Sequence, residues 1–481
     1  MIASMKTAVV EKRHSPRAGD DKGRTMRILI AVLISLTLFI QTLPVMGGEI
    51  PEIHRDATIG LLMERAIASN LIAGGVVVIG NREGILSTTT RGTLDLPGAP
   101  PISEDTIFDL ASLTKVVATT PAVMKLVDKK LVSLTDPISR WFPEFRKRRY
   151  GNITIINLLT HTSGLVDFNL LPGQSMKSYI RKMAEQKAAK PGTRFNYADV
   201  NFILLGELVH RVSGKPLDVF CRENLYKPLG ARQTMFAPPG EMADSIAPTV
   251  GMASGVVQDH NARRLGGVAG HAGLFSSAND LAKFARMLLG NGTIDGKRVL
   301  SEKLVKQMTV PYYCSSKTVI RAPGWDMESP FSAPKGNFFS ESSYGHTGYS
   351  GTSIWIDPTQ DLFVITLTTR LDYGNTRIFN QLRRDISTFA AAGFSVAGMM
   401  ADSGARMPRD LPKPLMAKNS KNRTTSVAAA AKKKKPAKLS LNKNKKVKKP
   451  VRKQYSRPGN SLSPLPPLSK SPTSSSGNAQ L

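Results

Sequence analysis

The sequence predicts a mixed α/β (α+β) fold, in which an antiparallel sheet is flanked by helices and joined to a mostly helical second lobe. Helical periodicity covers 56–70 and a segment near 377–391, and β-type runs cover 75–79 and 85–90. Two further strands, 351–357 and 361–367, follow His346 and are joined by an Asp-Pro-Thr-Gln turn. The hydrophobic content of 41% is enough for a conventional core.

A serine and a lysine stand one helical turn apart, directly after the strand-like run 106–108. Ser112 opens an apolar helical segment, and Lys115 shares its face, so the lysine can reach the serine hydroxyl. The first-turn N–H groups stay free to bind an anion. The same Ser-x-x-Lys spacing occurs at 332–335 and 440–443 without this context. The pattern indicates an activated serine nucleophile, and the alternative is a surface serine that caps the helix. Pro121 predicts a kink in that helix.

Two downstream motifs, Phe195-Asn196-Tyr197-Ala198-Asp199 and His346-Thr347-Gly348, occur in the order that a known mechanism needs. Together with Ser112 and Lys115 they resemble the penicillin-recognising serine hydrolases, the family of class C β-lactamases, low-molecular-weight DD-peptidases and related esterases and D-aminopeptidases. Other segments match in family order over roughly 53–391: 158–165, 191–193, 204–207, 213–216, 228–230 and 273–281. The resemblance implies a β-lactamase/transpeptidase-like fold, with a helical lobe over about 115–265 and Ser112 in the cleft between the lobes.

The resemblance also implies a reaction. Ser112 would attack a carbonyl carbon and become acylated, while either Lys115 with a depressed pKa or a tyrosinate at Tyr197 takes its proton. Tyr197 would return the proton to the leaving group. The backbone N–H groups of Ser112 and Tyr349 would hold the oxyanion, with Tyr349 on an edge strand and Gly348 allowing a substrate backbone to approach.

The substrate-binding residues implied by the resemblance are Asp199, His346, Thr347, Gly348 and Tyr349. Two of them depart from the commonest family pattern. Asp199 replaces an asparagine, and its carboxylate could accept a hydrogen bond, pair with Lys115 or recognise an amine. His346 replaces a lysine, which weakens the case for an efficient β-lactamase.

These motifs predict a serine hydrolase that acylates Ser112 with an amide or ester, most plausibly a D-amino-acid peptide of cell-wall type, as in a DD-carboxypeptidase. One alternative is an esterase or β-lactamase that uses the same residues. Another is a non-catalytic penicillin-binding or wall-binding module. The intact set of Ser112, Lys115 and Tyr197 favours catalysis.

Other conspicuous residues have plainer interpretations. His161 is expected to stabilise a loop near the cleft. Asp259, Asn261 and His271 flank the glycine-rich run 266–273, which either lines the pocket or makes a tight crossing. This run lacks a nucleotide-binding context, and no metal-binding spacing of His or Cys is present, so neither cofactor nor metal is expected. The two cysteines, Cys221 and Cys314, are expected to be buried and unpaired.

The N-terminal region predicts export. An uninterrupted apolar run, 28–40, follows Met26-Arg27, and cleavage is plausible after Gly47 or Gly48. Translation would then begin at Met26, whereas use of Met1 would leave residues 28–45 as a signal anchor. The predicted divisions are an extension with a signal peptide or anchor (1–48), the hydrolase domain (49–400) and a basic tail (401–481), with the domain in the periplasm or elsewhere outside the cytoplasmic membrane.

The formal charge of +30 is unevenly distributed. From Leu411 onward the chain carries 18 Lys and Arg and no Asp or Glu, in a stretch rich in Pro, Ser and Ala. This composition predicts a disordered tail, either a solvated extension or an arm for anionic polymers. Because an export signal is present, anionic lipid or an acidic cell-wall polymer is the expected partner, and nucleic acid is not expected. The oligomeric state cannot be predicted from these patterns.

Overall fold

A computed structural model describes residues 52–95, 98–146, 152–187, 189–314 and 318–402. The predicted signal segment and the predicted basic tail after Leu411 lie outside the described residues. Among the described residues, no helix combines the length and the apolar character needed to cross a membrane.

The main sheet is antiparallel and eight-stranded, in the order β2-β1-β14-β13-β12-β11-β10-β9. The predicted strands before and after the helical lobe are all present in it, and the predicted hairpin after His346 is β13 with β14. The bounds are β1 Ile72–Gly80, β2 Ile85–Gly92, β9 Tyr312–Cys314, β10 Val319–Arg321, β11 Asp326–Glu328, β12 Tyr344–Thr347, β13 Ser353–Asp357 and β14 Leu362–Arg370.

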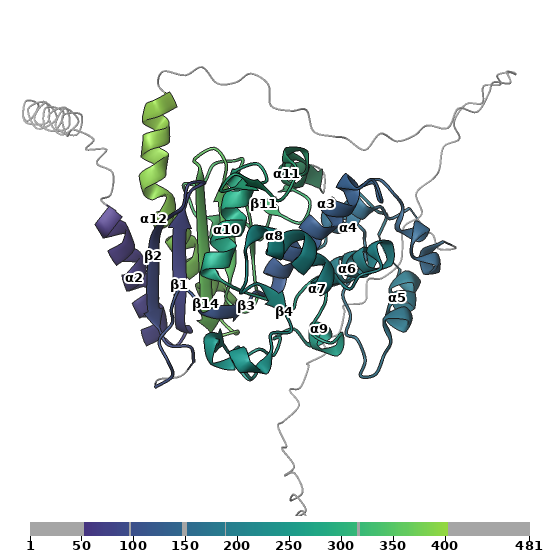
Figure 1. Cartoon of the computed structure of the whole chain (residues 1–481), viewed down its shortest axis with the longest axis horizontal. Helices are drawn as coiled ribbons and strands as arrows, with labels where there is room; N and C mark the ends of the chain where they lie inside the picture. Colours follow the sequence, from purple (N-terminus) through teal and green to yellow (C-terminus); the bar gives the residue numbers. More distant parts are fainter. Residues whose placement is uncertain (1–51, 96–97, 147–151, 188, 315–317, 403–481) are drawn as a thin grey trace, which may run out of the picture. The chain divides into compact units, whose positions relative to one another are not determined.

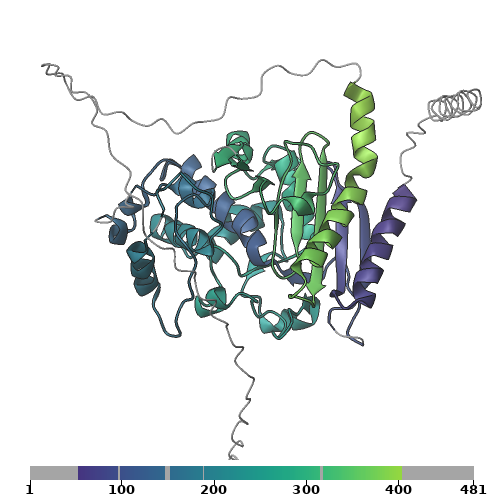
Figure 2. The ribbon, with the colours of Figure 1, turned by 180° about the vertical axis from the view of Figure 1, so that it is seen from behind.

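Helices cover both faces of this sheet (Figures 1 and 2). The predicted terminal helices are α2 (Glu52–Ala68) and α12 (Thr376–Asp402), which pack against each other on one face, while α10 (Ala278–Leu289) contacts the opposite face. Side chains alternate along a strand. Accordingly, Val77 and Ile79 of β1 belong to the core beneath α2 and α12, whereas Val76 and Val78 belong to the larger core that continues into the helical lobe.

A smaller sheet connects the two lobes. Its order is β4 (Met235–Phe236), β6 (Leu274–Ser277), β3 (Ile107–Asp109) and β5 (Ile246–Ala247). Strand β3 pairs antiparallel with β6 and parallel with β5. The strand-like run predicted before Ser112 is therefore real, and it brings the start of the nucleophile segment beside residues 274–277.

The predicted helical lobe is also present, with α3–α9 over Thr120–Arg264. Its α-helices are α3 Thr120–Asp128, α4 Ile155–Leu159, α5 Met176–Glu185, α6 Asp199–Ser213, α7 Leu217–Cys221, α8 Lys227–Leu229 and α9 His260–Arg264. Outside the lobe, the strands and the α-helix not yet named are β7 Thr293–Ile294, β8 Lys297–Arg298 and α11 Glu302–Thr309. Cys221 and Cys314 are free and buried, as predicted.

The segment after Ser112 is not one continuous α-helix. A 3₁₀ turn at Ala111–Leu113 is followed by a π-turn at Lys115–Thr119, and only then does α3 begin. Pro121 lies at the start of α3, where a missing N–H costs little. The expected mid-helix conflict at Pro121 is thus avoided because the helix changes type before the proline.

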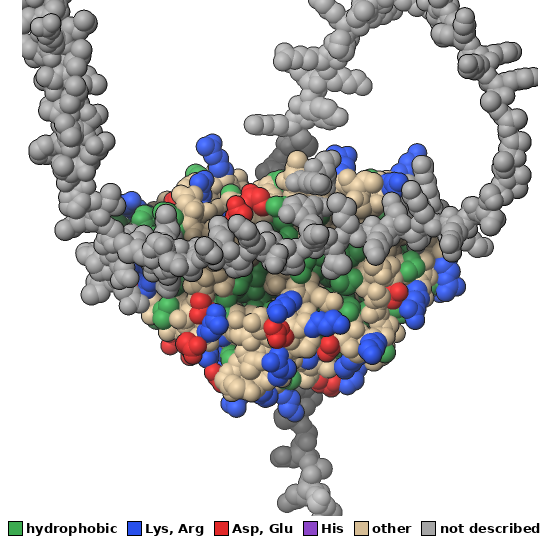
Figure 3. Space-filling model, turned by 90° about the horizontal axis from the view of Figure 1, so that it is seen from above, with side chains coloured by type: hydrophobic (Ala, Val, Ile, Leu, Met, Phe, Trp, Pro, Cys, Tyr) green, Lys and Arg blue, Asp and Glu red, His purple; other side chains and the backbone are tan. Residues whose placement is uncertain are grey.

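The surface visible from above carries Lys and Arg side chains interspersed with Asp and Glu (Figure 3). The view therefore shows no extended patch of a single charge among the coloured side chains on this face.

Candidate active site

The turn before the nucleophile is held by a buried carboxylate. Ala111 has a positive φ of 45°, unusual for a residue with a Cβ, and its N–H donates to Asp109 Oδ1 at 2.8 Å. The N–H of Gln258 donates to Asp109 Oδ2 at 2.7 Å. Burial raises the pKa of Asp109 to about 6, even though these two hydrogen bonds favour the carboxylate. Asp109 thus fixes the backbone from which Ser112 projects.

Lys115 lies at the centre of the site. Its ammonium is fully buried and donates to Ser112 Oγ at 3.0 Å and to the backbone carbonyl of His271 at 2.9 Å. It also lies 2.7 Å from Asp199 Oδ1. Tyr197 lines both cavities beside Ser112, and the Lys115 ammonium lies 5.2 Å from the centroid of the Tyr197 ring. The structure therefore brings the three predicted catalytic side chains into one contact group, with Asp199 as a fourth member.

The charges in this group differ from the prediction for the lysine. Burial disfavours the ammonium, but the negative charge of Asp199 holds the pKa of Lys115 above its ordinary value, so the predicted depressed pKa is wrong for this arrangement. Likewise, burial favours a neutral Asp199, yet Lys115 keeps the pKa of Asp199 below its ordinary value. Burial raises the pKa of Tyr197, which favours the neutral phenol at pH 7. Of the three roles open to Asp199 from sequence, pairing with Lys115 is the one that the structure shows.

The His161 ring packs against the Tyr197 ring. The two rings are stacked, with centroids 4.4 Å apart and an angle of 25° between their planes. His161 Nδ1 accepts the Ala198 N–H at 3.1 Å, and burial holds the pKa of His161 well below its ordinary value. A neutral, buried ring in this position fits the predicted role in the loop near the cleft.

The turn 348–352 joins the sheet to the nucleophile segment. Ser350 Oγ donates to the Asp109 carbonyl at 2.6 Å, and Thr352 Oγ1 donates to the Leu110 carbonyl at 3.0 Å. A Cβ on Gly348 would collide with that Leu110 carbonyl and with Thr352 Oγ1. The glycine therefore admits the nucleophile segment, and its role in the approach of a substrate backbone stays a prediction.

The predicted edge-strand position also needs correction. Strand β12 is internal in the sheet order, and Tyr349 follows it in the turn. However, β11 pairs with β12 at a single position, Asp326 with Gly345. Residues 346–347 consequently have a partner on one side only and remain beside the cavity.

One cavity of about 220 Å³ lies on the sheet side of Ser112. Its lining includes His346, Thr347, Gly348 and Tyr349, which were predicted to bind substrate, and three arginines that were not predicted: Arg321, Arg370 and Arg383. Burial, and the positive charges of Arg321 and Lys115, hold the pKa of His346 well below its ordinary value. Since His346 Nδ1 contacts the Thr347 carbonyl at 2.9 Å, it carries the proton, and His346 Nε2 is left as an acceptor.

The arginines differ in their partners. Arg321 pairs with Asp326 at 3.0 Å, whereas Arg370 and Arg383 make no salt bridge with a carboxylate of the described residues. Arg383 donates to the carbonyls of Gly348 and Thr352. Burial, reinforced by the charge of Arg370, lowers the pKa of Arg383 to about 9. Two neighbouring guanidinium groups that form no salt bridge within the described residues make this side of the cleft suited to a carboxylate.

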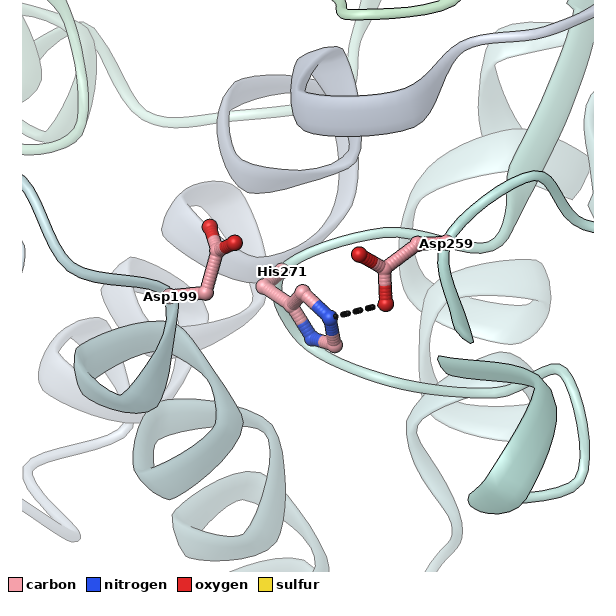
Figure 4. A group of neighbouring side chains, drawn as sticks. All are labelled: Asp199, Asp259 and His271. Carbon is pink, nitrogen blue, oxygen red and sulfur yellow. Dashed lines mark hydrogen bonds and ion pairs between the residues drawn. The ribbon is translucent and has the colours of Figure 1, made fainter. Parts of the chain in front are cut away.

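A second cavity of about 320 Å³ lies on the other side of Ser112 and shares Tyr197 and Tyr349 with the first. Asp199, Asp259 and His271 line it, and one donor atom from each lies within 4.8 Å of the others. His271 lies between the two carboxylates, and its Nε2 is 2.8 Å from Asp259 Oδ1 (Figure 4). Burial opposes ionisation of Asp259, but His271 holds its pKa below the ordinary range. Asp259 and His271 therefore line the pocket, while Asn261 accepts the Leu170 N–H and holds a loop.

The residues that sequence reasoning missed come from segments without a recognisable motif. Arg370 ends β14 and Arg383 lies within α12, so a local pattern does not connect either residue with Ser112. Asp109 adjoins the nucleophile motif, but its carboxylate gains a function only through contact with Gln258. Only for Asp109 does the sequence carry a signal, an acidic residue at the end of an apolar strand.

Comparison with known proteins gives consistent matches. The Beta-lactamase family model matches residues 61–386. An N-acetylmuramyl-L-alanine amidase from Bacillus subtilis (strain 168) is 32% identical over 307 residues, which cover 55% of this chain and 68% of that protein. A provisionally named D-alanyl-D-alanine carboxypeptidase from Salmonella agona (strain SL483) is 29% identical over 304 residues, which cover 55% of this chain and 70% of that protein.

Among solved structures, a penicillin-binding protein homologue from Caulobacter crescentus matches with a TM-score of 0.57. The identity is 20%, and the match covers 70% of this chain and 97% of that one. At this identity the likeness concerns the fold, and it confirms the predicted β-lactamase/transpeptidase-like architecture.

Proposed function

The chain belongs to the Beta-lactamase family of serine hydrolases, and from this premise we propose that it is an exported enzyme that forms an acyl-enzyme at Ser112. The proposed substrate is a peptide with a D-amino acid at its carboxyl end, cleaved as in a DD-carboxypeptidase. The observation that supports the chemistry is the hydrogen bond from Lys115 to Ser112, with Tyr197 lining the same cavities as Ser112. Export rests on the apolar run at 28–40.

In the proposed acylation, Ser112 Oγ bonds to the scissile carbonyl carbon and its proton passes into the Tyr197–Lys115 pair. The carbonyl π electrons move onto oxygen, and the backbone N–H groups of Ser112 and Tyr349 are the proposed donors to that oxyanion. Collapse of the tetrahedral intermediate breaks the C–N bond, and the proton returns to the leaving amine from Tyr197. Water then repeats the sequence on the ester and restores Ser112.

The arginine side of the cleft favours a leaving group with a carboxylate. Arg370 and Arg383 lack a carboxylate partner among the described residues, and both line the cavity that contains Ser112. His346 is neutral and therefore offers no charge to a carboxylate, unlike the lysine of the commoner motif. A D-amino acid leaving group would place its terminal carboxylate against the two guanidinium groups.

The first test is covalent labelling of residues 49–400 with a fluorescent penicillin and with a fluorophosphonate. Intact mass and peptide mapping should locate the adduct on Ser112, and Ser112→Ala should not be labelled. Preference for penicillin supports the peptidase, whereas preference for fluorophosphonate favours the esterase alternative. Folded protein that reacts with neither probe would contradict the enzyme and favour a non-catalytic binding module.

A further inference from the structure

We propose that the cavity lined by Asp199, Asp259 and His271 is a subsite for a primary ammonium group on the acyl part of the substrate. This inference rests on the proposed function, because it takes Ser112 as the acylated residue. It adds that the residue whose carbonyl Ser112 attacks carries a free α-amino group and is therefore the first residue of the peptide. The motifs do not specify this.

The first argument is the excess of negative charge. Four carboxylates lie on this side of the cleft: Asp199 and Asp259 line the cavity, while Asp109 and Asp167 accept the N–H groups of Gln258 and Val200 beside it. Three basic groups face them: Lys115, which pairs with Asp199, His271, which contacts Asp259, and the Arg263 guanidinium, which donates to the backbone carbonyls of Val257 and Gln258. The acids also affect one another: burial and then the charge of Asp199 raise the pKa of Asp167. A cationic group that entered the cavity would relieve this repulsion.

The second argument is the supply of free acceptors. Lys115 contacts Asp199 through Oδ1, and both His271 and the Ala262 N–H contact Asp259 through Oδ1. Within the described part of the chain, neither Oδ2 atom accepts a hydrogen bond. An ammonium group has three N–H donors and no acceptor, so it matches two carboxylate oxygens that still lack donors.

The third argument is reach. Asp199 Oδ1 lies 2.7 Å from Lys115 Nζ, which lies 3.0 Å from Ser112 Oγ. These two contacts in series place the carboxylate no more than about 6 Å from the nucleophile, or two hydrogen-bond lengths. An ammonium on the carbon next to the scissile carbonyl fits that interval, because it is two bonds from the carbon that Ser112 attacks.

A divalent metal ion suits this cluster less well. The same three side chains could each offer one ligand atom, but the buried Lys115 ammonium already lies 2.7 Å from the Asp199 oxygen. An ion bound to that carboxylate would be close to a fixed positive charge at low dielectric. An ammonium carries half the charge of a divalent ion and adds its own hydrogen-bond donors, so we assign the site to an amine.

The two cavities together define a polarity for the substrate. Both contain Ser112, and one is lined by carboxylates while the other is lined by arginines. A short D-peptide with a free amino group on its acyl residue and a free carboxylate on its leaving residue complements both sides. This polarity predicts preference for an unblocked dipeptide over its N-acetylated form.

The experiment compares D-Ala-D-Ala with N-acetyl-D-Ala-D-Ala, using the full chain and measuring released D-Ala. The leaving group is identical, so the two differ only in the ammonium. We expect kcat/KM for the free dipeptide to exceed that for the acetylated one at least tenfold. Equal or better cleavage of the acetylated peptide overturns the inference but leaves the proposed function intact, whereas no release of D-Ala from either contradicts the DD-carboxypeptidase proposal itself.

Asp259→Asn is the diagnostic variant. Asparagine still caps α9 and can hydrogen-bond His271, so the change removes charge with little loss of structure. The ratio of the two kcat/KM values should fall towards one. Glu302→Gln, at an exposed position on α11, is the matched control and should leave the ratio unchanged. A ratio that Asp259→Asn does not alter would contradict the assignment.

A binding measurement makes the test independent of turnover. In Ser112→Ala, calorimetry should show that D-alaninamide binds at least tenfold more tightly than N-acetyl-D-alaninamide, and that adding Asp259→Asn removes the difference. Titration of the same variant with Zn²⁺ and with Mn²⁺ tests whether the site binds a metal ion instead. Equal affinities for the two amides would overturn the inference, and so would stoichiometric metal binding that Asp259→Asn abolishes.

Discussion

At the scale of single residues, Asp199 controls the protonation of Lys115. The carboxylate is 2.7 Å from the ammonium and holds its pKa above the ordinary value, so the free enzyme keeps a charged lysine beside Ser112. Either Tyr197 accepts the serine proton with Lys115 as a charged support, or Lys115 must first lose its own proton. These two routes respond in opposite ways when Asp199 is neutralised.

Asp199→Asn should move the Lys115 titration to lower pH by roughly 1–3 units, because an opposite charge in contact has been removed. The measurement is the pH dependence of Ser112 labelling by fluorophosphonate. If Lys115 is the base, labelling at pH 7 becomes faster, since more lysine is neutral. If Tyr197 is the base, the loss of charged lysine lowers labelling at high pH. An unchanged profile would contradict the coupling of Asp199 to the reaction.

Asp109 should leave a signature in stability. Its pKa is about 6 in the folded state against 3.8 for the ordinary carboxyl, so the folded state binds more protons between these values. Stability should therefore fall as pH rises from 4 to 6, by up to about 3 kcal/mol from this group. Urea unfolding of the wild type and of Asp109→Asn over this pH range isolates the contribution of Asp109. If the unfolding free energies of the two proteins changed equally with pH, the prediction would be contradicted.

At the scale of elements, the turn after β12 holds Tyr349, a proposed oxyanion donor, beside the nucleophile segment. Ser350 and Thr352 hold it against residues 109–110, and Gly348 leaves no room for a Cβ. This contact joins residues more than 200 positions apart, so local pattern could not reveal it. The motif around Gly348 was recognisable from sequence, but the physical reason for its glycine was not.

Gly348→Ala should lower the free energy of unfolding by about 1–3 kcal/mol, because the added methyl group overpacks a fixed backbone contact. Ser112 labelling should slow roughly 10- to 100-fold as the nucleophile segment shifts. Gly84→Ala is the matched control, since a Cβ there meets nothing within 4 Å. Thermal unfolding and labelling rates of both variants check the prediction, which fails if the two behave alike.

The strands and terminal helices were predictable because each shows its own periodicity: β1 alternates between two cores, and α2 and α12 cover one of them. The helix after Ser112 was predicted only in outline. Its 3₁₀, π and α portions depend on packing of the buried Lys115 and on Pro121, which periodicity does not report. The motif residues of the site were predictable, whereas the arginines and the charge of Lys115 depend on three-dimensional neighbours.

At the scale of the whole molecule, charge separates into two regions. The described surface in Figure 3 mixes both signs, while the segment after Leu411 has 18 Lys and Arg and no acid. Much of the net positive charge of the chain therefore comes from a part of the sequence that lies outside the described residues. We propose that this segment binds anionic lipid or cell-wall polymer, independently of the chemistry at Ser112.

Removing the residues after Asp410 should abolish salt-sensitive binding to anionic vesicles and to sacculi, because 18 positive charges are lost with no compensating acid. Binding of the full chain should weaken between low salt and 0.5 M NaCl, about where the Debye length falls below the spacing of exposed charges. Replacing Lys432–Lys435 by glutamine should give an intermediate loss, at about 1 kcal/mol per lysine near the surface. Labelling of Ser112 should be equal in all three forms, since the residues that line the two cavities at Ser112 all precede the removed segment. Unchanged vesicle binding after truncation would contradict the proposal and would assign the membrane contact to the catalytic domain.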